Sequence, residues 1–469
     1  MGQITPLPKK GSLKSPANWR PVVIMCPMSK VLESVLNVQL RSHLEENGLM
    51  SKVQHAYRKA RSCQSAWLEL DTVVQEARNG GRHAALVLTD QSAAFNLVKA
   101  DIILSKLKVF GLDDVASKLI RSYLTGRSTK CIVGRGHSHW TSLRSGVGEG
   151  SVVGPLFFVV TLCDVTVVST RTVKRLKDMG VEIEVNLIAY ADDVSAIVVG
   201  GSEDDLQLGI DVVMDEFEQY FSAAGLSMNP TKSELVVFRC GKVKKELKVG
   251  DQVEAKSAKL LGVTVSQGYG FGKHAKMVAA TVRTKVEKLS QVTDIMDWKT
   301  RKIVFDAVIL SSLTYCLSVW GWRLDWRKIA QKSMNSALRL LTGGTRYTRI
   351  EDMLTRASWL NLDNLWRLES LMSLRRLCES RNSDLMFEVL TRATNHRYMV
   401  RQDGLKLGWN PRNSHGHNAF IWTAVKEANV LRMPQRTWYD DRKGMKMTNS
   451  QIRSTLKSEL IDLYGNDNL

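Results

Sequence analysis

Residues 185–199 of this 469-residue chain read VNLIAYADDVSAIVV. Two apolar runs rich in β-branched residues, 185–190 and 194–199, flank Ala191, Asp192 and Asp193. This spacing is typical of two antiparallel strands joined by a tight turn. Adjacent carboxylates next to an apolar core are costly unless solvent or a cation meets them. The stretch therefore predicts a β-hairpin with a candidate metal site at its tip, although an ordinary polar turn fits the same residues.

A third carboxylate follows the short apolar run 84–89, which predicts a buried strand that ends at Asp90. Nucleotidyl transfer uses two metal ions about 3.5–4 Å apart, so carboxylates from at least two strands must converge. Asp90 is the natural partner of the hairpin, provided that its strand lies beside it. Because side chains alternate along a strand, we favour Asp192 as the direct ligand and expect Asp193 to face partly away.

Helical periodicity surrounds these strands. Apolar residues recur at three- and four-residue steps after Ser29, a candidate N-cap, and again after Ser202, which has Asp205 three residues on. Another helix is expected beyond Lys99. Past Gly270 strand signals fade, and helices are predicted over residues 281–289, 301–317 and 329–341.

The bulk properties favour a basic, folded protein. The net charge of +19 and the isoelectric point near 9.6 indicate a polyanionic partner, with nucleic acid the main expectation and an anionic membrane surface the alternative. Seven scattered cysteines without a CxxC pair suggest neither a disulfide framework nor a zinc module, and fit a reducing compartment. The apolar stretch 303–322 contains Asp306 and predicts a buried helix rather than a membrane span.

Several blocks, in order, resemble the reverse transcriptase domain of non-LTR (LINE-type) retrotransposons near the jockey-like elements, over nearly the whole chain. The first are similar to the fingers segment of that family, which has Gly-Phe-Arg and Gly-Arg-Ser where this chain has Ala56-Tyr57-Arg58 and Ala60-Arg61-Ser62. These blocks are NWRP at 18–21, SKVLE at 29–33, EENGL at 45–49, QHAYR at 54–58 and ARS at 60–62. The resemblance implies that Arg58 and Arg61 contact the triphosphate or the template, the alternative being ordinary surface charges.

DQSAAFN at residues 90–96 resembles the first catalytic block, whose leading Asp binds metal. The resemblance implies that Phe95 packs against the incoming sugar and excludes a 2′-hydroxyl, which selects deoxynucleotides. A core aromatic is the alternative for Phe95. The family block usually ends in Asp, where this chain has Asn96.

GVGEGSVVGPL at residues 146–156 is similar to the Pro-Gln-Gly-Ser block, whose backbone lies against the template and the nascent base pair. Gly150 and Ser151 are the implied contacts. Gly148 and Glu149 replace the family's Pro and Gln, and an acidic side chain near phosphates is electrostatically awkward. A glycine-rich loop before an apolar helix is the alternative interpretation.

The remaining blocks complete the resemblance. GLSMNPTKSE at 225–234 implies that Lys232 lies near the triphosphate and stabilises or protonates the pyrophosphate, where a solvated lysine is the alternative. LLGV at 260–263 resembles the hairpin that supports the primer, so that Leu261 and Gly262, with Tyr190 of the YADD string, would contact template or primer. Tyr315, VWG at 319–321 and ALRLLTG at 337–343 look like the helical thumb.

The implied fold class is α+β, a right-hand polymerase with an antiparallel-sheet palm that has the YADD hairpin in its centre. Fingers and palm would span residues 1–265, truncated at the N-terminus, the helical thumb 266–375, and a basic C-terminal region 376–469. The implied enzyme is an RNA-directed DNA polymerase that uses two Mg²⁺ ions, or Mn²⁺, on Asp90, Asp192 and Asp193. Its partners would be an RNA template, a DNA primer or target DNA, and dNTPs, and no membrane.

Two alternatives stay open. A catalytically inactive nucleic-acid-binding remnant would explain Asn96, Gly148 and Glu149, and an RNA-templated RNA polymerase would share the palm chemistry. Phe95 and the Ala of the YADD string favour the deoxynucleotide enzyme. We expect an intracellular protein of cytoplasm and nucleus, without an endonuclease, a ribonuclease H or a terminal zinc knuckle in this chain.

Overall fold

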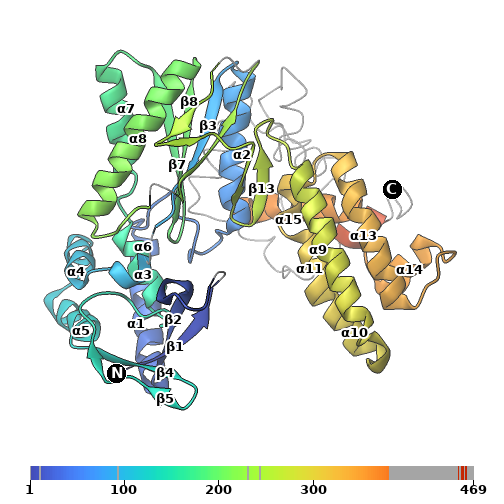
Figure 1. The fold of residues 1–469 in the computed structure, drawn as a ribbon, viewed down its shortest axis with the longest axis horizontal. Helices are drawn as coiled ribbons and strands as arrows, with labels where there is room; N and C mark the ends of the chain where they lie inside the picture. The colour runs from blue at the N-terminus through green and yellow to red at the C-terminus, as the bar shows by residue number, and fades with distance from the viewer. Residues whose placement is uncertain are drawn as a thin grey trace, which may run out of the picture. The chain divides into compact units, whose positions relative to one another are not determined.

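The computed structural model describes residues 2–9, 12–91, 94–229, 232–241 and 245–379, with residues 453, 456–458 and 460–461 near the C-terminus (Figure 1). Most of the expected C-terminal region 376–469 lies outside these residues. The chain forms two compact units. The first comprises Met1–Arg61, Ala85–Leu235 and Lys244–Glu254, and the second Ser62–Ala84, Val236–Val243 and Ala255–Leu469.

A four-stranded sheet carries the predicted hairpin. Its strand order is β7-β8-β3-β9, and its strands are β7 (Ile183–Tyr190), β8 (Asp193–Gly200), β3 (His83–Leu88) and β9 (Glu234–Phe238). β7 and β8 pair antiparallel in the register that sets Tyr190 opposite Asp193, which confirms the hairpin.

The expected position of the hairpin in the centre of the sheet is wrong, because β7 is a terminal strand in this order. The segment before Ala56 covers its outer edge: the Ala189 N–H donates to the Val53 carbonyl at 2.9 Å, and the His55 N–H donates to the Ala189 carbonyl at 2.8 Å. Hydrogen-bonding groups at the end of β7 are thus satisfied by an irregular segment, not by a further strand.

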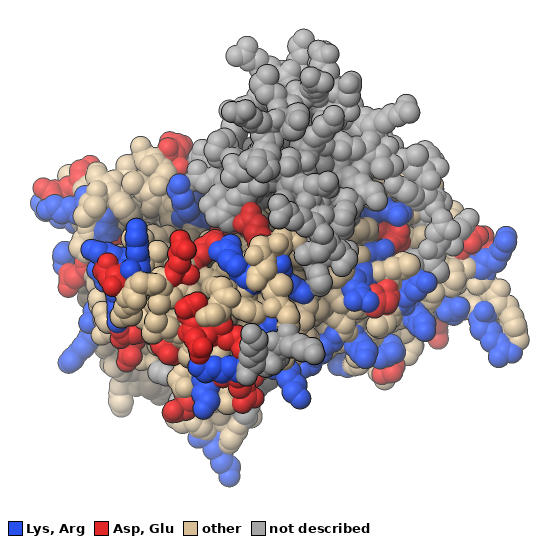
Figure 2. Space-filling model, turned by 90° about the horizontal axis from the view of Figure 1, so that it is seen from above, with Lys and Arg blue, Asp and Glu red and all other residues tan. Residues whose placement is uncertain are grey.

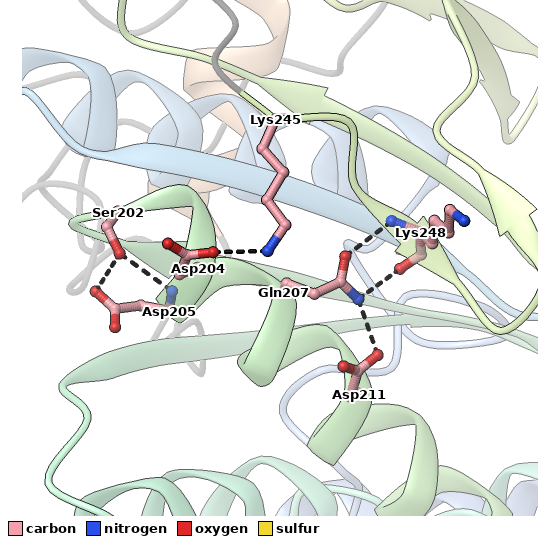
Figure 3. A network of polar contacts seen from close by, with 7 residues as sticks. All are labelled: Ser202, Asp204, Asp205, Gln207, Asp211, Lys245 and Lys248. Atoms are coloured by element: carbon pink, nitrogen blue, oxygen red, sulfur yellow. Dashed lines mark hydrogen bonds and ion pairs between the residues drawn. The ribbon is translucent and has the colours of Figure 1, made fainter.

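Two helices, α7 (Val167–Asp178) and α8 (Glu203–Ala223), pack on the hairpin strands (Figure 1). The predicted cap of α8 is confirmed, since the Ser202 side chain accepts a hydrogen bond from the Asp205 N–H. Its apolar stripe is buried apart from the half-buried Met214. The polar side of α8 meets the small hairpin of β10 (Lys248–Val249) and β11 (Gln252–Val253) through Gln207 and Lys248 (Figure 3).

A second sheet of the first unit has the order β2-β1-β4-β5, with β6 also on β4. Its strands are β1 (Gly2–Pro8), β2 (Trp19–Met25), β4 (Ser128–Val133), β5 (Gly136–His137) and β6 (Thr141–Ser142). The first unit also contains α1 (Pro27–Glu46), α3 (Ala94–Leu97), α4 (Ala100–Val109), α5 (Asp114–Leu124) and α6 (Gly154–Thr161). The expected cap at Ser29 is wrong, because α1 already begins at Pro27, a residue whose fixed φ favours the first helical position.

The second unit is mainly helical, as predicted past Gly270. It contains α2 (Cys63–Asn79) and the hairpin β12 (Ser257–Leu260) and β13 (Val263–Ser266). The helices that follow are α9 (Gly272–Ser290), α10 (Trp298–Phe305), the π-helix η4 (Asp306–Leu310), α11 (Ser311–Thr314), α12 (Leu317–Trp320), α13 (Leu324–Thr342), α14 (Ile350–Ala357) and α15 (Leu362–Glu379).

The stretch 303–322 is not the single helix that its sequence predicts. Helix α11 ends at Thr314, Tyr315 is extended, and the backbone turns left-handed at Cys316, with φ +48°, before α12 begins. None of the helices in the described part of the chain combines the length and the apolar character needed to cross a bilayer. The functional division at residue 265 stays a prediction.

Candidate active site

The turn between β7 and β8 has a left-handed residue, Ala191, with φ +54°. Gln54 holds it there. Its side-chain oxygen accepts hydrogen bonds from the Ala191 N–H at 2.9 Å and from the Ala56 N–H at 3.0 Å, and the side chain is 1% exposed. Because a non-glycine residue in this region costs about 1–2 kcal/mol, the turn needs such support. A buried amide therefore fixes the conformation that presents Asp192 and Asp193.

Asp90 lies beside this turn, as predicted. Both the N–H of Thr89, at 3.3 Å, and its hydroxyl, at 2.7 Å, donate to the carbonyl of Val194, which places the end of β3 against the start of β8. Burial raises the pKa of Asp193 to about 6, helped by the negative charges of Asp192 and Asp90. Burial also raises the pKa of Asp192, and Asp90 adds to the rise. The three carboxylates thus share one electrostatic environment, in which a cation would relieve their repulsion.

In this structure Lys232 places a positive charge next to Asp90. Its Nζ lies 3.1 Å from Oδ2 of Asp90, and the N–H of Asn229 donates to the Asp90 carbonyl at 2.9 Å. Within the described residues, no group of three or more Asp, Glu, His or Cys side chains is placed to hold a metal ion together. In this structure Lys232 therefore pairs with Oδ2 of Asp90, and its predicted place near the triphosphate stays a prediction.

The glycine-rich loop, residues 146–152, runs along the block that starts at Asp90. The Gly146 N–H donates to the Val98 carbonyl at 2.7 Å, and the Val147 N–H donates to the Phe95 carbonyl at 2.9 Å. Gly146 has φ +92°, and a Cβ there would lie 3.0 Å from the Asn96 carbonyl oxygen. The loop thus needs glycine to approach the catalytic block this closely.

The other end of the loop lies on β2. The Val23 N–H donates to the Glu149 carbonyl at 2.7 Å, and a Cβ on Gly150, with φ +113°, would lie 2.6 Å from the Val23 carbonyl oxygen. Ser151 is buried, and its hydroxyl accepts from the Gly154 N–H at 3.0 Å, at the start of α6. Its hydroxyl therefore has a local structural partner, and the contact expected with the template stays a prediction.

Phe95 stacks on Phe158 with a centroid distance of 4.6 Å and an interplanar angle of 20°. The ring of Phe95 is half-buried: one part packs in the core, as the alternative interpretation has it, and the other part is accessible. Its contact with the sugar stays a prediction. The Asn96 carbonyl accepts from the Ser145 hydroxyl at 3.0 Å, so this position supports the loop through its backbone.

Glu149, the awkward acid of the loop, has a cationic partner. Its carboxylate lies 3.5 Å from Nε of Arg20 on β2. Burial raises the pKa of Glu149, while Arg20 opposes the rise and the charge of Asp192 adds to it. Arg20 also opposes part of the rise that burial and Asp90 cause in the pKa of Asp192. Tyr57 is close to the same group, since burial and then the charge of Asp192 raise its pKa. The sequence alone does not predict these roles of Arg20, Tyr57 and Gln54, although all three residues lie in blocks that resemble the family.

The two predicted arginines have structural partners. Arg58 forms an ion pair with Glu45 at 2.8 Å and donates to the Ser51 carbonyl at 2.6 Å, with its side chain 9% exposed. Arg61 donates to the Lys52 carbonyl. Nothing in this geometry directs Arg58 to a nucleotide, because its guanidinium is already engaged.

Leu261 and Gly262 form the turn between β12 and β13, as the resemblance implied, with φ of +44° and +83°. This turn belongs to the second unit. The Tyr315 hydroxyl donates to the Leu261 carbonyl at 2.8 Å, and the Trp67 ring N–H donates to the Leu260 carbonyl at 3.2 Å. Two aromatic side chains therefore hold the turn expected to support a primer. Tyr190, the last predicted contact, ends β7 opposite Asp193.

Known proteins match this chain. The family model described as reverse transcriptase (RNA-dependent DNA polymerase) matches residues 7–265. The probable RNA-directed DNA polymerase from transposon BS of Drosophila melanogaster is 23% identical over 396 residues, covering 78% of this chain and 42% of the relative. The Pol polyprotein of the type-1 element R2 of Popillia japonica is 26% identical over 230 residues, covering 49% and 31%. Apo telomerase from Candida tropicalis aligns with a TM-score of 0.43 and 9% identity, covering 83% of this chain and 68% of telomerase.

Proposed function

This chain belongs to the reverse transcriptase (RNA-dependent DNA polymerase) family, and on that premise we propose that it extends a DNA primer on an RNA template. It spans 42% and 38% of the lengths of two Drosophila transposon polymerases that it matches, so the proposal concerns this part of such a protein. The α+β prediction agrees with the mainly antiparallel sheets and the many helices of the described residues. We further propose that it acts inside the cell, in cytoplasm and nucleus.

One observation carries the proposal: Asp90 follows β3, and Thr89 between them is hydrogen-bonded to Val194 of the Asp192–Asp193 hairpin. Carboxylate oxygens are the ligands that Mg²⁺ prefers. Burial raises the pKa of Asp192 and of Asp193, and the negative charge of Asp90 adds to both rises. Asp90 and Asp192 would hold the ions, with Asp193 beside them. Two bound Mg²⁺ ions would activate the primer 3′-hydroxyl and stabilise charge on the pyrophosphate.

The other residues have supporting roles in this proposal. Lys232, on leaving Asp90, would meet the negative charge of the triphosphate. Phe95, fixed on Phe158, would border the sugar of the incoming deoxynucleotide. The backbone of the loop 146–152 would lie along the nascent base pair, where its glycines permit close approach.

Template and primer would be held mainly through phosphate contacts, whose strength falls as salt rises. On the face seen in Figure 2, Lys and Arg side chains are interspersed with Asp and Glu rather than gathered in one patch. The net charge of +19 therefore supports general attraction of nucleic acid, while placement depends on local groups such as those of the loop.

Primer extension on an RNA template with Mg²⁺ tests the proposal, with dNTPs compared with NTPs. We expect dNTP incorporation by the wild type and none by Asp192→Ala. Asp204→Ala is the matched control, since Asp204 is an exposed Asp of the same unit, paired only with Lys245 among the contacts seen in Figure 3. A folded wild type that incorporates no dNTP would refute the polymerase, and full activity of Asp192→Ala would refute the site.

A further inference from the structure

Helix α1 buries a carboxylate and exposes apolar side chains. Glu33 is 0% exposed, whereas its neighbours Val31, Leu32 and Val35 are 60%, 45% and 50% exposed. A buried carboxylate is costly unless hydrogen bonds and opposite charge compensate it. The position of Glu33 therefore calls for specific partners within the first unit.

One partner is the glycine-rich loop. The N–H of Val152 donates to Oε2 of Glu33 across 119 residues of sequence. Tyr123 on α5 lies near the same carboxylate: burial and then the charge of Glu33 raise the pKa of its phenol, and its hydroxyl and Oε1 of Glu33 are both buried polar atoms without another hydrogen-bond partner among the described residues. A hydrogen bond from a backbone N–H to an ionised carboxylate is about twice as strong as a neutral one. Glu33 thus anchors the C-terminal end of the loop.

Arg127 anchors the other end. Its guanidinium donates to the Gly146 carbonyl and lies 6.0 Å from the centre of the Tyr123 ring. Burial lowers the pKa of Arg127, and the groups that oppose this are Tyr123 and then Glu33. Glu33, which is buried, and the half-buried Tyr123 and Arg127 are therefore one cluster, with opposite charges at its two ends.

The loop between these anchors needs an external support. Gly146, Gly148 and Gly150 lie within seven residues, and glycine loses more conformational freedom on ordering than any other residue. The loop's own backbone contacts are to Val98, Phe95 and Val23. Contacts at both ends limit the movement of the glycines between them.

We infer that Glu33, Tyr123 and Arg127 are positioning residues that hold the loop 146–152 against the block beginning at Asp90, and thereby set the accuracy and rate of nucleotide insertion. The inference rests on the proposed function. None of the three touches the reacting atoms; they act through the backbone of Gly146 and Val152. A loop that shifts by about 1 Å is enough to slow a positioned reaction by about 100-fold.

Single-nucleotide insertion on an RNA template is the first test. We expect Glu33→Ala to lower kcat/KM for the correct dNTP by about 10- to 100-fold and to raise the proportion of mismatched insertion. Glu33→Gln keeps an acceptor for the Val152 N–H and should recover most of that loss. Glu46→Gln, an exposed glutamate of the same helix, is the matched control. Active-site titration corrects for unfolded protein.

Hydrogen exchange supplies a readout that does not depend on activity. The amides of residues 146–152 should exchange faster in Glu33→Ala and in Tyr123→Phe, which removes only a hydroxyl group, and not in Glu46→Gln. Unchanged exchange in both variants would overturn the inference, as would wild-type kcat/KM and accuracy per active molecule in Glu33→Ala. A wild type that shows protected loop amides but no incorporation would instead refute the proposed function.

Discussion

Replacing Gln54 by Met tests how the hairpin turn is held. Methionine has similar length and volume but no strong hydrogen-bond acceptor. The substitution therefore leaves the N–H groups of Ala191 and Ala56 without the side-chain oxygen that they share, while it keeps the core filled. The Nε2 atom of Gln54 has no hydrogen-bond partner in the structure, so little else is lost.

The magnitude follows from those two contacts. A buried donor that loses its partner costs about 1–3 kcal/mol, so two such groups cost about 2–6 kcal/mol if the turn stays in place. Ala191 stores about 1–2 kcal/mol in its left-handed conformation, which favours a shift of the turn once Gln54 no longer holds it. We expect Gln54→Met to lower the free energy of unfolding by about 2–6 kcal/mol. A displaced turn would also lower kcat/KM for dNTP by about 100-fold.

Chemical denaturation and single-nucleotide insertion measure the two effects. Gln207→Met is the matched control, because Gln207 also accepts from one backbone N–H, that of Lys248 at 2.9 Å, but on the surface of α8 away from the hairpin turn (Figure 3). It should leave kcat/KM unchanged. Ala191→Gly should restore about 1 kcal/mol to Gln54→Met by removing the left-handed penalty. If Gln54→Met unfolds and turns over like the wild type, the support assigned to Gln54 is wrong.

Three further variants test separate parts of the molecule. Lys232→Met should change the free energy of unfolding by under about 1 kcal/mol, because the ion pair of Lys232 with Asp90 is exposed. Single-turnover nucleotide insertion should nevertheless slow by about 100-fold, and an unchanged rate would contradict the role of Lys232 at the triphosphate. Tyr315→Phe should lower the free energy of unfolding by about 0.5–1.5 kcal/mol through loss of the hydrogen bond to the Leu261 carbonyl. An unchanged melting temperature would show that this hydrogen bond does not stabilise the fold. Burial, and then the charge of Lys259, lower the pKa of His274 to about 4 from 6.5, so the unfolded chain binds the proton first and stability falls as pH drops from 6.5 towards 4. Between pH 6.5 and 4, the free energy of unfolding of the wild type should fall by up to about 3 kcal/mol more than that of His274→Gln, as measured by chemical denaturation at each pH. The same pH dependence in both proteins would refute the assignment.

Local sequence signals predicted the elements whose causes are local. The hairpin of β7 and β8 follows from two apolar runs rich in β-branched residues around a short polar turn, and the start of α8 follows from the Ser202 cap. The cap of α1 was misassigned because Ser29 and Pro27 are both acceptable near a helix start, and only the backbone decides between them. The order of strands in the sheet is harder to predict from the sequence, because the segment that covers the edge of β7 contains Val53 and His55, far earlier in the chain.

The supports of the site could not be predicted because their partners are distant in sequence. Gln54 reaches a turn 137 residues away, and Glu33 reaches a loop 119 residues away. Neither residue has a distinctive neighbourhood in sequence, and a glutamate on a helix is ordinarily solvated. The apolar pattern after Ser29 predicts that Val31, Leu32 and Val35 lie in the core, but the structure exposes these three side chains. It buries Glu33 with Leu40 and Leu44 instead.

The unusual acid of the loop bears on whether this is a working enzyme or a remnant. A carboxylate at position 149 would repel both the nucleic acid phosphates and Asp192 if it were bare. Arg20 lies next to it at 3.5 Å, opposing the charge of Glu149 and that of Asp192 together. Arg20 stands in the NWRP block that resembles the family, so a cation of that block meets the acid of the loop, and Asp90, Asp192 and Asp193 are all present. The local compensation therefore favours a polymerase site that tolerates Glu149 over an inactive remnant.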